Sequence, residues 1–463
     1  MSNLDEELPE AHLHSWNPSQ KSLYEWIKVD SNNNIIVQDL RGTFADNMKA
    51  SIHRWFRYPA GFSYSLVEEA FKKYIVSKSC IVLDPFVGVG TTCVCAKKYG
   101  IPSIGVEAHP LIAWIARVKT YWDFDFKYLK KYVNQILFEI NRVIEGSKDI
   151  DVTNKPPLLQ KCFDKEKLSQ LYALKNYSEK ISDERVRDIF ILALLSTLRR
   201  VSKAHTGWPY ILPKKERKKV PDVLQTFQSQ LKMMISDLEA VVTEDNKKTP
   251  ADIIMDDARR LSCFIDKEID FAFTSPPYLN NYDYADRTRL ELYFLSPFKI
   301  DGEIINTSSW SDLTRQIRSK LIVNVSHQAV ELGLPEGLLP SFEIPEHIRE
   351  KLIDISERLR REKALHGGHK DYDIMVVAYF NDMFETLKEV YKVMKPDAYY
   401  LLVLGDSAPY GVHVPTDVLL AQIALGIGFS SAKIGLLRTR GEKWKSAPKH
   451  RVPLRESMVI LQK

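Results

Sequence analysis

Cysteine is scarce in this sequence of 463 residues, and its few copies are not arranged in pairs. The five cysteines are odd in number and include no Cys-x-x-Cys motif. A disulfide framework and a structural zinc site are therefore not expected, and we predict no metal site. This cysteine usage is typical of a chain that works in a reducing cytoplasm.

Long hydrophobic runs are also missing. The longest one, residues 189–195, is far too short to span a bilayer. The chain begins with acidic residues and no apolar stretch, so we expect no signal peptide. These features predict a soluble cytoplasmic protein without a membrane partner.

Charge of one sign is not strongly in excess, since the formal net charge is only +5. The positive side chains nevertheless gather in two segments, 196–222 and 438–456, as a phosphate-binding surface requires. A single run of positive charge is more often a solvated loop, so neither segment alone is strong support for DNA binding. The candidate DNA-binding residues are Arg199, Arg200, Lys203, Lys214 and Lys215 in the first segment and Arg438, Arg440 and Lys443 in the second.

Short apolar runs alternate with helical patterns along much of the chain. This alternation predicts a doubly wound α/β sheet, mostly parallel, with a C-terminal antiparallel hairpin. Strands are predicted at 80–84, 103–107, 252–255, 269–273, 399–404, 433–437 and 457–461, and helices at 91–99, 111–119, 372–394 and 414–425.

Two stretches interrupt the alternation and are predicted to be insertions into the core. The first, 121–250, has mostly helical patterns, and the second, 298–370, is mixed. Each is a candidate for DNA or target recognition, with plain structural padding as the alternative. The remaining parts are an N-terminal extension at 1–50, the cofactor-binding half of the core at 51–120, a catalytic segment at 251–297 and the C-terminal part of the core at 371–463.

The first chemical motif is Asp-Pro-Phe-Val-Gly-Val-Gly-Thr-Thr at 84–92, between a predicted strand and a predicted helix. Its glycines permit a sharp turn and a close approach to a ligand. Amides at the helix N-terminus can meet a carboxylate, and Asp84 can pair with an ammonium group. Cys93 replaces the third glycine of a dinucleotide fingerprint, and no Gly-Lys-Ser/Thr follows, which disfavours nicotinamide and ATP.

An acidic residue ends the next predicted strand. Glu107 ends the run Ile-Gly-Val-Glu, about twenty residues after the glycine turn. A carboxylate at that place can accept hydrogen bonds from the two hydroxyls of an unmodified ribose. An isolated glutamate would more often be a solvated loop residue; its place after the glycine turn favours the binding role.

The second chemical motif, Thr-Ser-Pro-Pro-Tyr at 274–278, comes directly after the predicted strand 269–273. Two consecutive prolines restrict the backbone and leave their carbonyls free as acceptors. These carbonyls and the hydroxyl of Ser275 can accept hydrogen bonds from an amino group, and Tyr278 offers a ring for stacking. The set suits a planar base with an amino group, although a Pro-Pro turn alone can be a rigid connector.

On these motifs the chain resembles the S-adenosylmethionine-dependent DNA amino-methyltransferases, and among them the cytosine-N4 type. The resemblance implies a Rossmann-like methyltransferase fold, S-adenosylmethionine as the cofactor, and catalytic roles for Ser275, Pro276, Pro277 and Tyr278. It assigns cofactor contacts to Asp84, Pro85, Phe86, Gly88, Gly90, Thr91, Thr92, Glu107 and Thr274, to Phe62 in the segment 53–62, and to Asp257 in the segment 255–259. Gly61 departs from the family pattern, in which a lysine is frequent.

The resemblance implies site-specific methylation of the N4 amino group of cytosine in duplex DNA, by direct transfer to a flipped base. A restriction-modification or host-protection role follows, with a cognate restriction endonuclease as a functional partner. No cysteine follows a proline, so a carbon-5 route is not expected. Adenine-N6 methylation is the first alternative; its tetrad usually begins with Asp or Asn, so Ser275 favours cytosine without settling the choice. An RNA base, or a silent nucleic-acid-binding module with this fold, are further alternatives.

Overall fold

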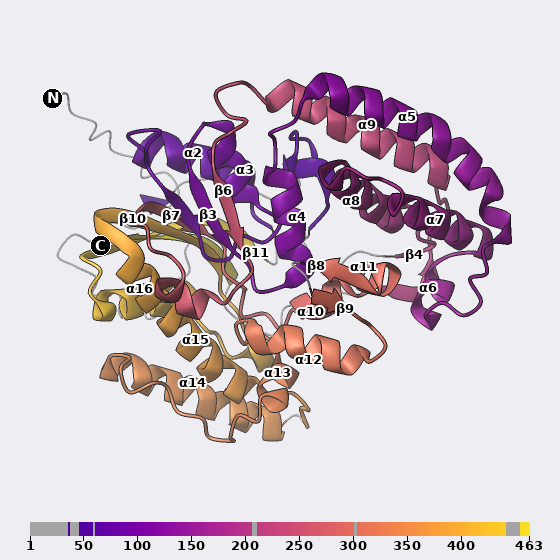
Figure 1. Cartoon of the computed structure of the whole chain (residues 1–463). Helices are drawn as coiled ribbons and strands as arrows, with labels where there is room; N and C mark the ends of the chain where they lie inside the picture. Colours follow the sequence, from indigo (N-terminus) through magenta and orange to yellow (C-terminus); the bar gives the residue numbers. More distant parts are fainter. Residues whose placement is uncertain are drawn as a thin grey trace.

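The computed structural model describes residues 36–37, 46–58, 61–205, 211–300, 303–365, 367–440 and 454–463 (Figure 1). In this part of the chain the main sheet has the strand order β1-β11-β12-β10-β7-β2-β3-β6. The strand β12 runs antiparallel to β10 and β11, and the other neighbours are parallel. The strands are β1 (Ile36–Val37), β2 (Val82–Asp84), β3 (Ser103–Val106), β6 (Ala251–Ile254), β7 (Ile269–Thr274), β10 (Met394–Gly405), β11 (Ser431–Arg440) and β12 (Leu454–Gln462). The predicted doubly wound α/β fold with its C-terminal hairpin is confirmed.

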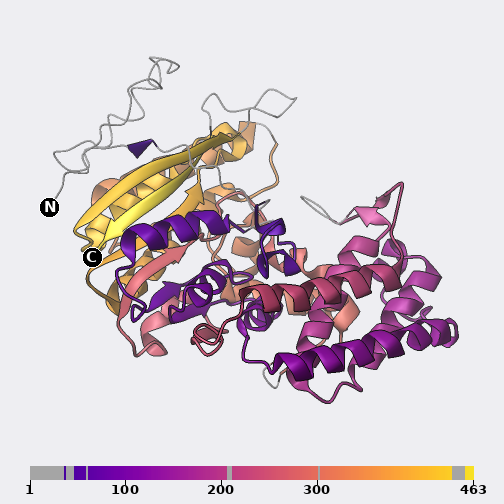
Figure 2. The ribbon, with the colours of Figure 1, turned by 90° about the horizontal axis from the view of Figure 1, so that it is seen from above.

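Helices cover both faces of this sheet because its strand residues alternate between two apolar surfaces (Figure 2). In β7, Phe271 and Phe273 pack toward α2 (Tyr64–Tyr74) and α3 (Thr91–Lys98), with α4 (Pro110–Thr120) extending this layer over β6. Ala272, between them, faces the opposite layer. That layer consists of α15 (Tyr372–Val393) and α16 (Thr416–Ile427), and α14 (Glu346–Leu365) lies against α15.

Between α4 and β6 the chain forms a helical unit beside the sheet, on the right in Figure 1. Three of its helices begin at aspartates, Asp125, Asp183 and Asp222, whose carboxylates accept the first free backbone amides. The unit comprises α5 (Phe126–Glu145), η5 (Gly146–Asp149), α6 (Pro157–Cys162), α7 (Lys165–Ser178), α8 (Glu184–Val201), the hairpin β4 (Ala204–His205) and β5 (Leu212–Glu216), and α9 (Val223–Val241).

A second excursion leaves the core after β7. It runs through α10 (Tyr284–Arg287), α11 (Arg289–Leu295), the hairpin β8 (Phe298–Ile300) and β9 (Glu303–Ile305), α12 (Trp310–Lys320) and α13 (Ser326–Glu331) to α14. Short 3-10 turns complete the fold: η3 (Asp46–Met48), η4 (His53–Trp55), η6 (Ala258–Cys263) and η7 (Pro409–Gly411).

All five cysteines lie in the described part and are free thiols, four of them buried. Among the described helices, none is both long and apolar enough to cross a membrane.

Candidate active site

A cavity opens where the carboxyl ends of four parallel strands meet. Open α/β sheets bind their ligands at this edge. The walls are residues 85–89 and Thr91 after β2, 107–109 after β3, 256–258 after β6, Ser275, Pro277 and Tyr284 after β7, and, from other parts of the chain, Tyr58, Gly61, Phe62 and residues 320–322. The cavity therefore brings together most of the residues that the sequence predicts for the cofactor and two of the four predicted catalytic residues.

Asp84 lies just behind the cavity wall at the end of β2 and is completely buried. Its Oδ1 accepts hydrogen bonds from the hydroxyl of Thr274 at 2.6 Å and from the amide of Phe86 at 3.1 Å. Its Oδ2 has no hydrogen-bond partner among the described residues. Burial raises the pKa of Asp84 to about 6, although the hydrogen bonds oppose the shift. A buried carboxylate oxygen in this state is costly, and a cationic ligand group such as an ammonium would satisfy it.

The glycine turn after β2 has the predicted backbone geometry. Gly88 and Gly90 adopt φ angles of 52° and 89°, which L-residues with a side chain rarely adopt. A Cβ at Gly90 would also lie 3.4 Å from Ala116 on α4. Gly90 occupies the N-cap position of α3, so the turn directs the free amides at the start of that helix toward the cavity.

Glu107 stands at the end of β3, on the neighbouring side of the cavity. Its Oε1 accepts a hydrogen bond from the amide of His109 at 2.8 Å. Burial raises the pKa of Glu107 to about 7, against backbone hydrogen bonds that favour the ionised form. The remaining acceptor capacity of this carboxylate is what a pair of ribose hydroxyls requires.

Phe62, just before α2, lines the cavity, and its ring centroid lies 5.4 Å from that of Phe273 on β7. The buried Asn47 holds this segment in place: its amide donates to the carbonyl of Phe62 at 2.9 Å, and its Oδ1 accepts the amide of Tyr64 at 2.8 Å. Pro59 and Ala60 of the same sequence motif lie outside the described residues.

Asp257 also lines the cavity, and its carboxylate is paired with Arg259, whose Nη2 lies 2.6 Å from Oδ2. The same guanidinium contacts Asp382 on α15 at 2.7 Å. The amide of Arg259 also donates to Oδ1 of Asp257 at 2.9 Å, so Arg259 fixes the orientation of this carboxylate at the cavity wall.

The segment after β7 divides between the core and the cavity. Thr274 is buried against Asp84, whereas Ser275 and Pro277 line the cavity. The side chain of Tyr278 lies outside the cavity lining, and its hydroxyl donates to Oε1 of Glu456 on β12 at 2.8 Å. Oε2 of Glu456 in turn accepts from the guanidinium of Arg438 on β11. The C-terminal hairpin thus holds the ring of Tyr278.

Several wall residues carry no recognisable motif. Tyr58 lies within the segment 53–62, in which the resemblance assigns a contact only to Phe62, and His109 follows Glu107 by two residues. Tyr284 belongs to an aromatic segment next to the tetrad, and residues 320–322 come from the second excursion. His109 is buried, with Nε2 2.8 Å from the hydroxyl of Thr288. Burial lowers its pKa to about 4, so the imidazole is neutral near pH 7.

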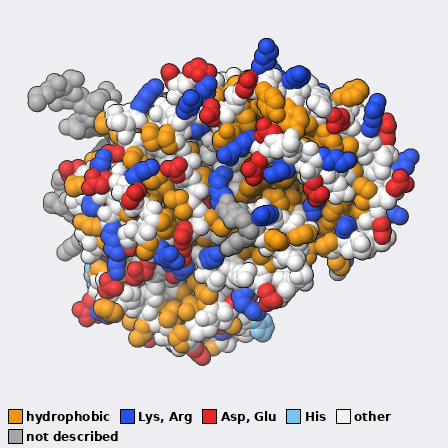
Figure 3. Space-filling model, in the orientation of Figure 1, with side chains coloured by type: hydrophobic (Ala, Val, Ile, Leu, Met, Phe, Trp, Pro, Cys, Tyr) orange, Lys and Arg blue, Asp and Glu red, His pale blue; other side chains and the backbone are white. Residues whose placement is uncertain are grey.

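The predicted DNA-binding residues have different surroundings. Arg199 is paired with the fully buried Glu291 on α11, with Nη2 3.0 Å from Oε2, so it does not offer the free cation that a phosphate contact requires. Arg200 is exposed, and Lys203 pairs with Asp164 at 3.0 Å. The side chains of Lys214, Lys215 and Arg440, and the whole of Lys443, lie outside the described residues. Figure 3 shows the face of the molecule that is turned to the viewer in Figure 1, with Lys and Arg side chains around its centre.

Residues 14–117 match a family model described as DNA methylase, N6_N4_Mtase, a span that includes the glycine turn and Glu107. The chain is 26% identical over 451 residues to the Type II methyltransferase M.BsoBI of Geobacillus stearothermophilus, covering 91% of this chain and 87% of the relative. It is 24% identical to M.AvaI of a Nostoc species, over 91% and 88% of the two chains, and 22% identical to M.MvaI of Kocuria varians, over 86% and 85%. These similarities support an N4/N6 DNA methyltransferase.

The methyltransferase relatives are comparable to this chain in length. A match over 91% of the chain is too long to leave out either of the two excursions from the sheet. The similarity therefore extends beyond the cavity and its motifs to the helical unit and to the segment that supplies residues 320–322.

Proposed function

We propose that this protein transfers a methyl group from S-adenosylmethionine to the N4 amino group of cytosine in duplex DNA, at a specific sequence. The biological role is modification in a restriction-modification or host-protection system, with a cognate restriction endonuclease as the functional partner. The observation that carries the proposal is the cavity itself. It places Ser275 and Pro277 beside the glycine turn, Glu107 and Asp257 at one edge of the sheet.

The cavity residues fit S-adenosylmethionine by their chemistry. The buried carboxylate of Asp84 suits the ammonium of the methionine end, and the amides at the start of α3 suit its carboxylate. Glu107 and Asp257 both line the cavity. The carboxylate of Glu107 suits the ribose hydroxyls, and that of Asp257 suits the amino group of the adenine. When bound, this cofactor supplies an electrophilic methyl group on a sulfonium.

The protein's part in catalysis is to orient the acceptor. The amino nitrogen of cytosine is a weak nucleophile because its lone pair is delocalised into the ring. Hydrogen bonds from the amino group to the hydroxyl of Ser275 and the carbonyl of Pro276 direct that lone pair out of the ring plane. They also stabilise positive charge as it grows on the nitrogen. No covalent enzyme intermediate is required.

A base inside duplex DNA cannot reach this cavity, so the target nucleotide flips out at a cost of a few kcal/mol. Tyr278 offers a ring on which the extruded base stacks, and Glu456 holds that ring from the hairpin. Of the predicted phosphate contacts, Arg200, Lys203 and Arg438 remain in the proposed DNA-binding set, together with Lys214, Lys215, Arg440 and Lys443. Arg199 is left out because its side chain is only 15% exposed and pairs with a fully buried carboxylate, whereas the ion-paired side chains of Lys203 and Arg438 are more exposed.

Adenine-N6 methylation is the alternative within the same chemistry, and the matched family description covers both amino groups. Ser275 favours cytosine, because an aspartate or asparagine in its place would accept the amino hydrogen of adenine more strongly. The identity of the methylated nucleoside decides between the two.

The variant Ser275→Ala tests the role of the cavity. We expect transfer of a labelled methyl group to duplex DNA to fall by about a hundredfold or more, since the variant loses an acceptor that acts in the transition state. Calorimetry should show a nearly unchanged affinity for S-adenosylmethionine.

The matched control is Ser262→Ala, which removes a hydroxyl that donates to Glu389 outside the cavity and should leave both quantities unchanged. Equal losses of transfer and cofactor affinity in Ser275→Ala would mean that the tetrad is structural rather than catalytic.

A further inference from the structure

The polypeptide between α12 and α13 lies against the loop that follows the tetrad. Asn324, whose side chain is only 1% exposed, is the central contact. Its Nδ2 donates to the carbonyl of Tyr278 at 3.3 Å and to that of Tyr282 at 2.9 Å. Both hydrogens of this side-chain amide thus donate to the same loop. They fix the positions of two carbonyls that are four residues apart in the sequence.

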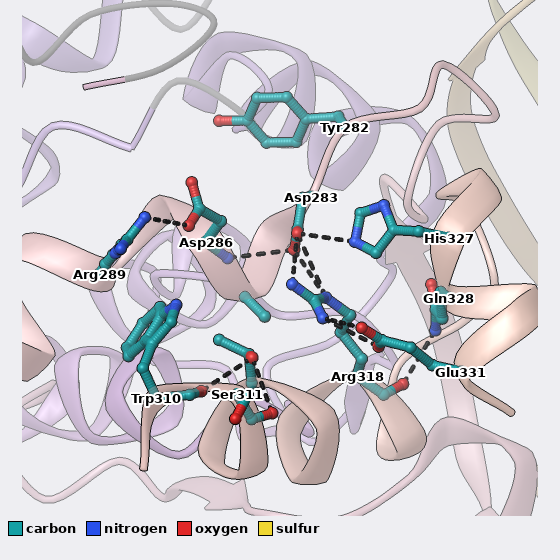
Figure 4. Close-up of polar contacts among 12 residues, drawn as sticks. Tyr282, Asp283, Asp286, Arg289, Trp310, Ser311, Arg318, His327, Gln328 and Glu331 are labelled. Atoms are coloured by element: carbon teal, nitrogen blue, oxygen red, sulfur yellow. Dashed lines mark hydrogen bonds and ion pairs between the residues drawn. The ribbon is translucent and has the colours of Figure 1, made fainter. Parts of the chain in front are cut away.

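A second set of contacts anchors the same loop a few residues later (Figure 4). Arg318 at the end of α12 pairs with Asp283 at 2.8 Å and with Glu331 on α13 at 2.8 Å. His327 approaches Asp283 from the other side, at 3.2 Å. These side chains point toward Asp283 from two helices of the second excursion.

Asn281, in the middle of the loop, adopts a left-handed backbone with φ of 56°. Asparagine adopts this conformation more readily than most residues with a side chain, and its own side chain takes part in holding it. Its Oδ1 accepts the amide of Ser326 at 2.9 Å. The loop 278–283 is therefore held at its beginning, middle and end by residues 318–327.

The same stretch also borders the cofactor side of the cavity. Residues 320–322 line the cavity, and the amide of Val323 donates to Asp382 at 2.8 Å. Asp382 pairs with Arg259, which orients Asp257. One short stretch of the second excursion thus contacts both the tetrad loop and the residues proposed for the adenine of the cofactor.

We propose that Asn324 is a positioning residue for methyl transfer, which fixes the carbonyl and hence the ring of Tyr278 where the flipped base stacks. This inference rests on the proposed function. It gives residues 318–327 a role in shaping the catalytic loop, apart from any role of the second excursion in target recognition.

The test is Asn324→Asp, which keeps the shape of the side chain but turns a donor into an acceptor that repels both carbonyls. A shift of about 1 Å at a reacting centre costs about a hundredfold in rate, and we expect kcat to fall by that order. The affinity for S-adenosylmethionine should stay within about threefold, because the cofactor contacts of Asp84 and Glu107 are unaffected.

The matched control is Asn381→Asp. Asn381 makes the same kind of contacts, donating to the carbonyl of Leu339 and accepting the amide of Ser341, but away from the tetrad loop. It should retain the wild-type kcat. Because Asn324 is buried, Arg318→Gln serves as the second variant: it loosens the loop at Asp283 and should lower kcat in the same direction even if Asn324→Asp does not fold.

Two readouts separate positioning from a general loss of structure. Hydrogen exchange of the peptide covering 276–285 should accelerate in Asn324→Asp and in Arg318→Gln but not in Asn381→Asp. The variant Tyr278→Ala keeps the backbone carbonyl that Asn324 contacts but lacks the ring that this contact positions. In that background the effect of Asn324→Asp on kcat should therefore largely disappear. Unchanged exchange and kcat in both loop variants, or losses equal to those of Asn381→Asp, would overturn the proposal.

Failure of the proposed function is visible separately, as a wild-type protein that methylates no DNA. The exchange measurement does not depend on activity. It reports on the contact between Asn324 and the tetrad loop in either case.

Discussion

Asp84 and Glu107 are two carboxyl groups at the ends of adjacent strands, and burial raises the pKa of both. The pKa values are about 6 for Asp84 and about 7 for Glu107, so both groups titrate within the range in which a protein can be assayed. The ionised carboxylates are the forms that accept a ribose hydroxyl or pair with an ammonium. Cofactor binding is therefore linked to their deprotonation.

The affinity for S-adenosylmethionine should consequently depend on pH. It should be highest above about pH 7 and fall as the pH drops through the pKa of Glu107, approaching about tenfold per unit for each group that must lose a proton. Titration calorimetry between about pH 5.5 and 8 measures the dependence. In Glu107→Gln the loss near pH 7 should vanish and leave only the loss near pH 6 that belongs to Asp84. The same profile in this variant and the wild type would contradict the role given to Glu107.

Tyr278 and Glu456 are a second pair whose interaction can be measured at the scale of residues. Tyr278→Phe keeps the ring and removes the hydroxyl, and Glu456→Ala removes the acceptor. A hydrogen bond to a carboxylate contributes about 1.5–3 kcal/mol. We expect each variant to lower kcat by about tenfold, and the double variant to be little worse than Glu456→Ala, because both variants remove the same hydrogen bond and Glu456→Ala also frees Arg438. Losses that multiply in the double variant would mean that the contact does not position the ring.

At the scale of elements, the ion pair between Arg199 and Glu291 joins α8 of the helical unit to α11 beside the tetrad. Removing one partner of a buried pair leaves the other charge uncompensated, at a cost of about 3–5 kcal/mol. Arg199→Ala should therefore lower the free energy of unfolding by about this amount, as measured by urea denaturation.

Arg200 is the matched control, because it is the adjacent arginine on the same helix but is exposed. Arg200→Ala should change stability little and instead reduce the salt dependence of DNA binding by about one phosphate contact. The opposite result, with Arg199→Ala stable but weak in DNA binding, would return Arg199 to the DNA-binding set.

The sheet could be predicted largely from local patterns, because buried parallel strands are short apolar runs with turn residues at their ends. The ends of the strands are harder to predict from the sequence than their presence. The predicted strand 399–404 belongs to β10, which begins at Met394, where it pairs with Ile269. The pairing is irregular between Met394 and Tyr399, and Asp397 has a φ of 62°. A polar interruption of this kind carries no strand periodicity in the sequence.

The site could be predicted as far as its residues follow one another along the chain. The glycine turn, Glu107 and the tetrad each adjoin a strand, and the parallel order of the sheet brings them together. Asn324 and Glu456 could not be predicted, because each acts through a contact with a residue more than forty positions away and belongs to no local motif. Arg199 illustrates the converse, since a basic run does not reveal which of its members a distant carboxylate engages.

At the scale of the whole molecule, the cavity lies at the carboxyl edge of the sheet and is also lined by residues 320–322 of the second excursion. The helical unit lies beside the sheet (Figure 1). The helical unit contacts α11 through the ion pair of Arg199 with Glu291. The second excursion contacts the tetrad loop through Asn324, and the C-terminal hairpin contacts Tyr278 through Glu456. Under the proposed function, we expect a flipped base to enter at the carboxyl edge of the sheet, where the cavity opens.

The central claim is that this protein methylates the amino group of cytosine in DNA. Nucleoside mass spectrometry of DNA from cells that express the wild-type chain tests it most directly, with cells expressing Ser275→Ala as the reference. We predict 4-methylcytosine in the first sample and its loss in the second. 6-Methyladenine without 4-methylcytosine would contradict the assignment of cytosine, and the absence of both bases would contradict the account as a whole.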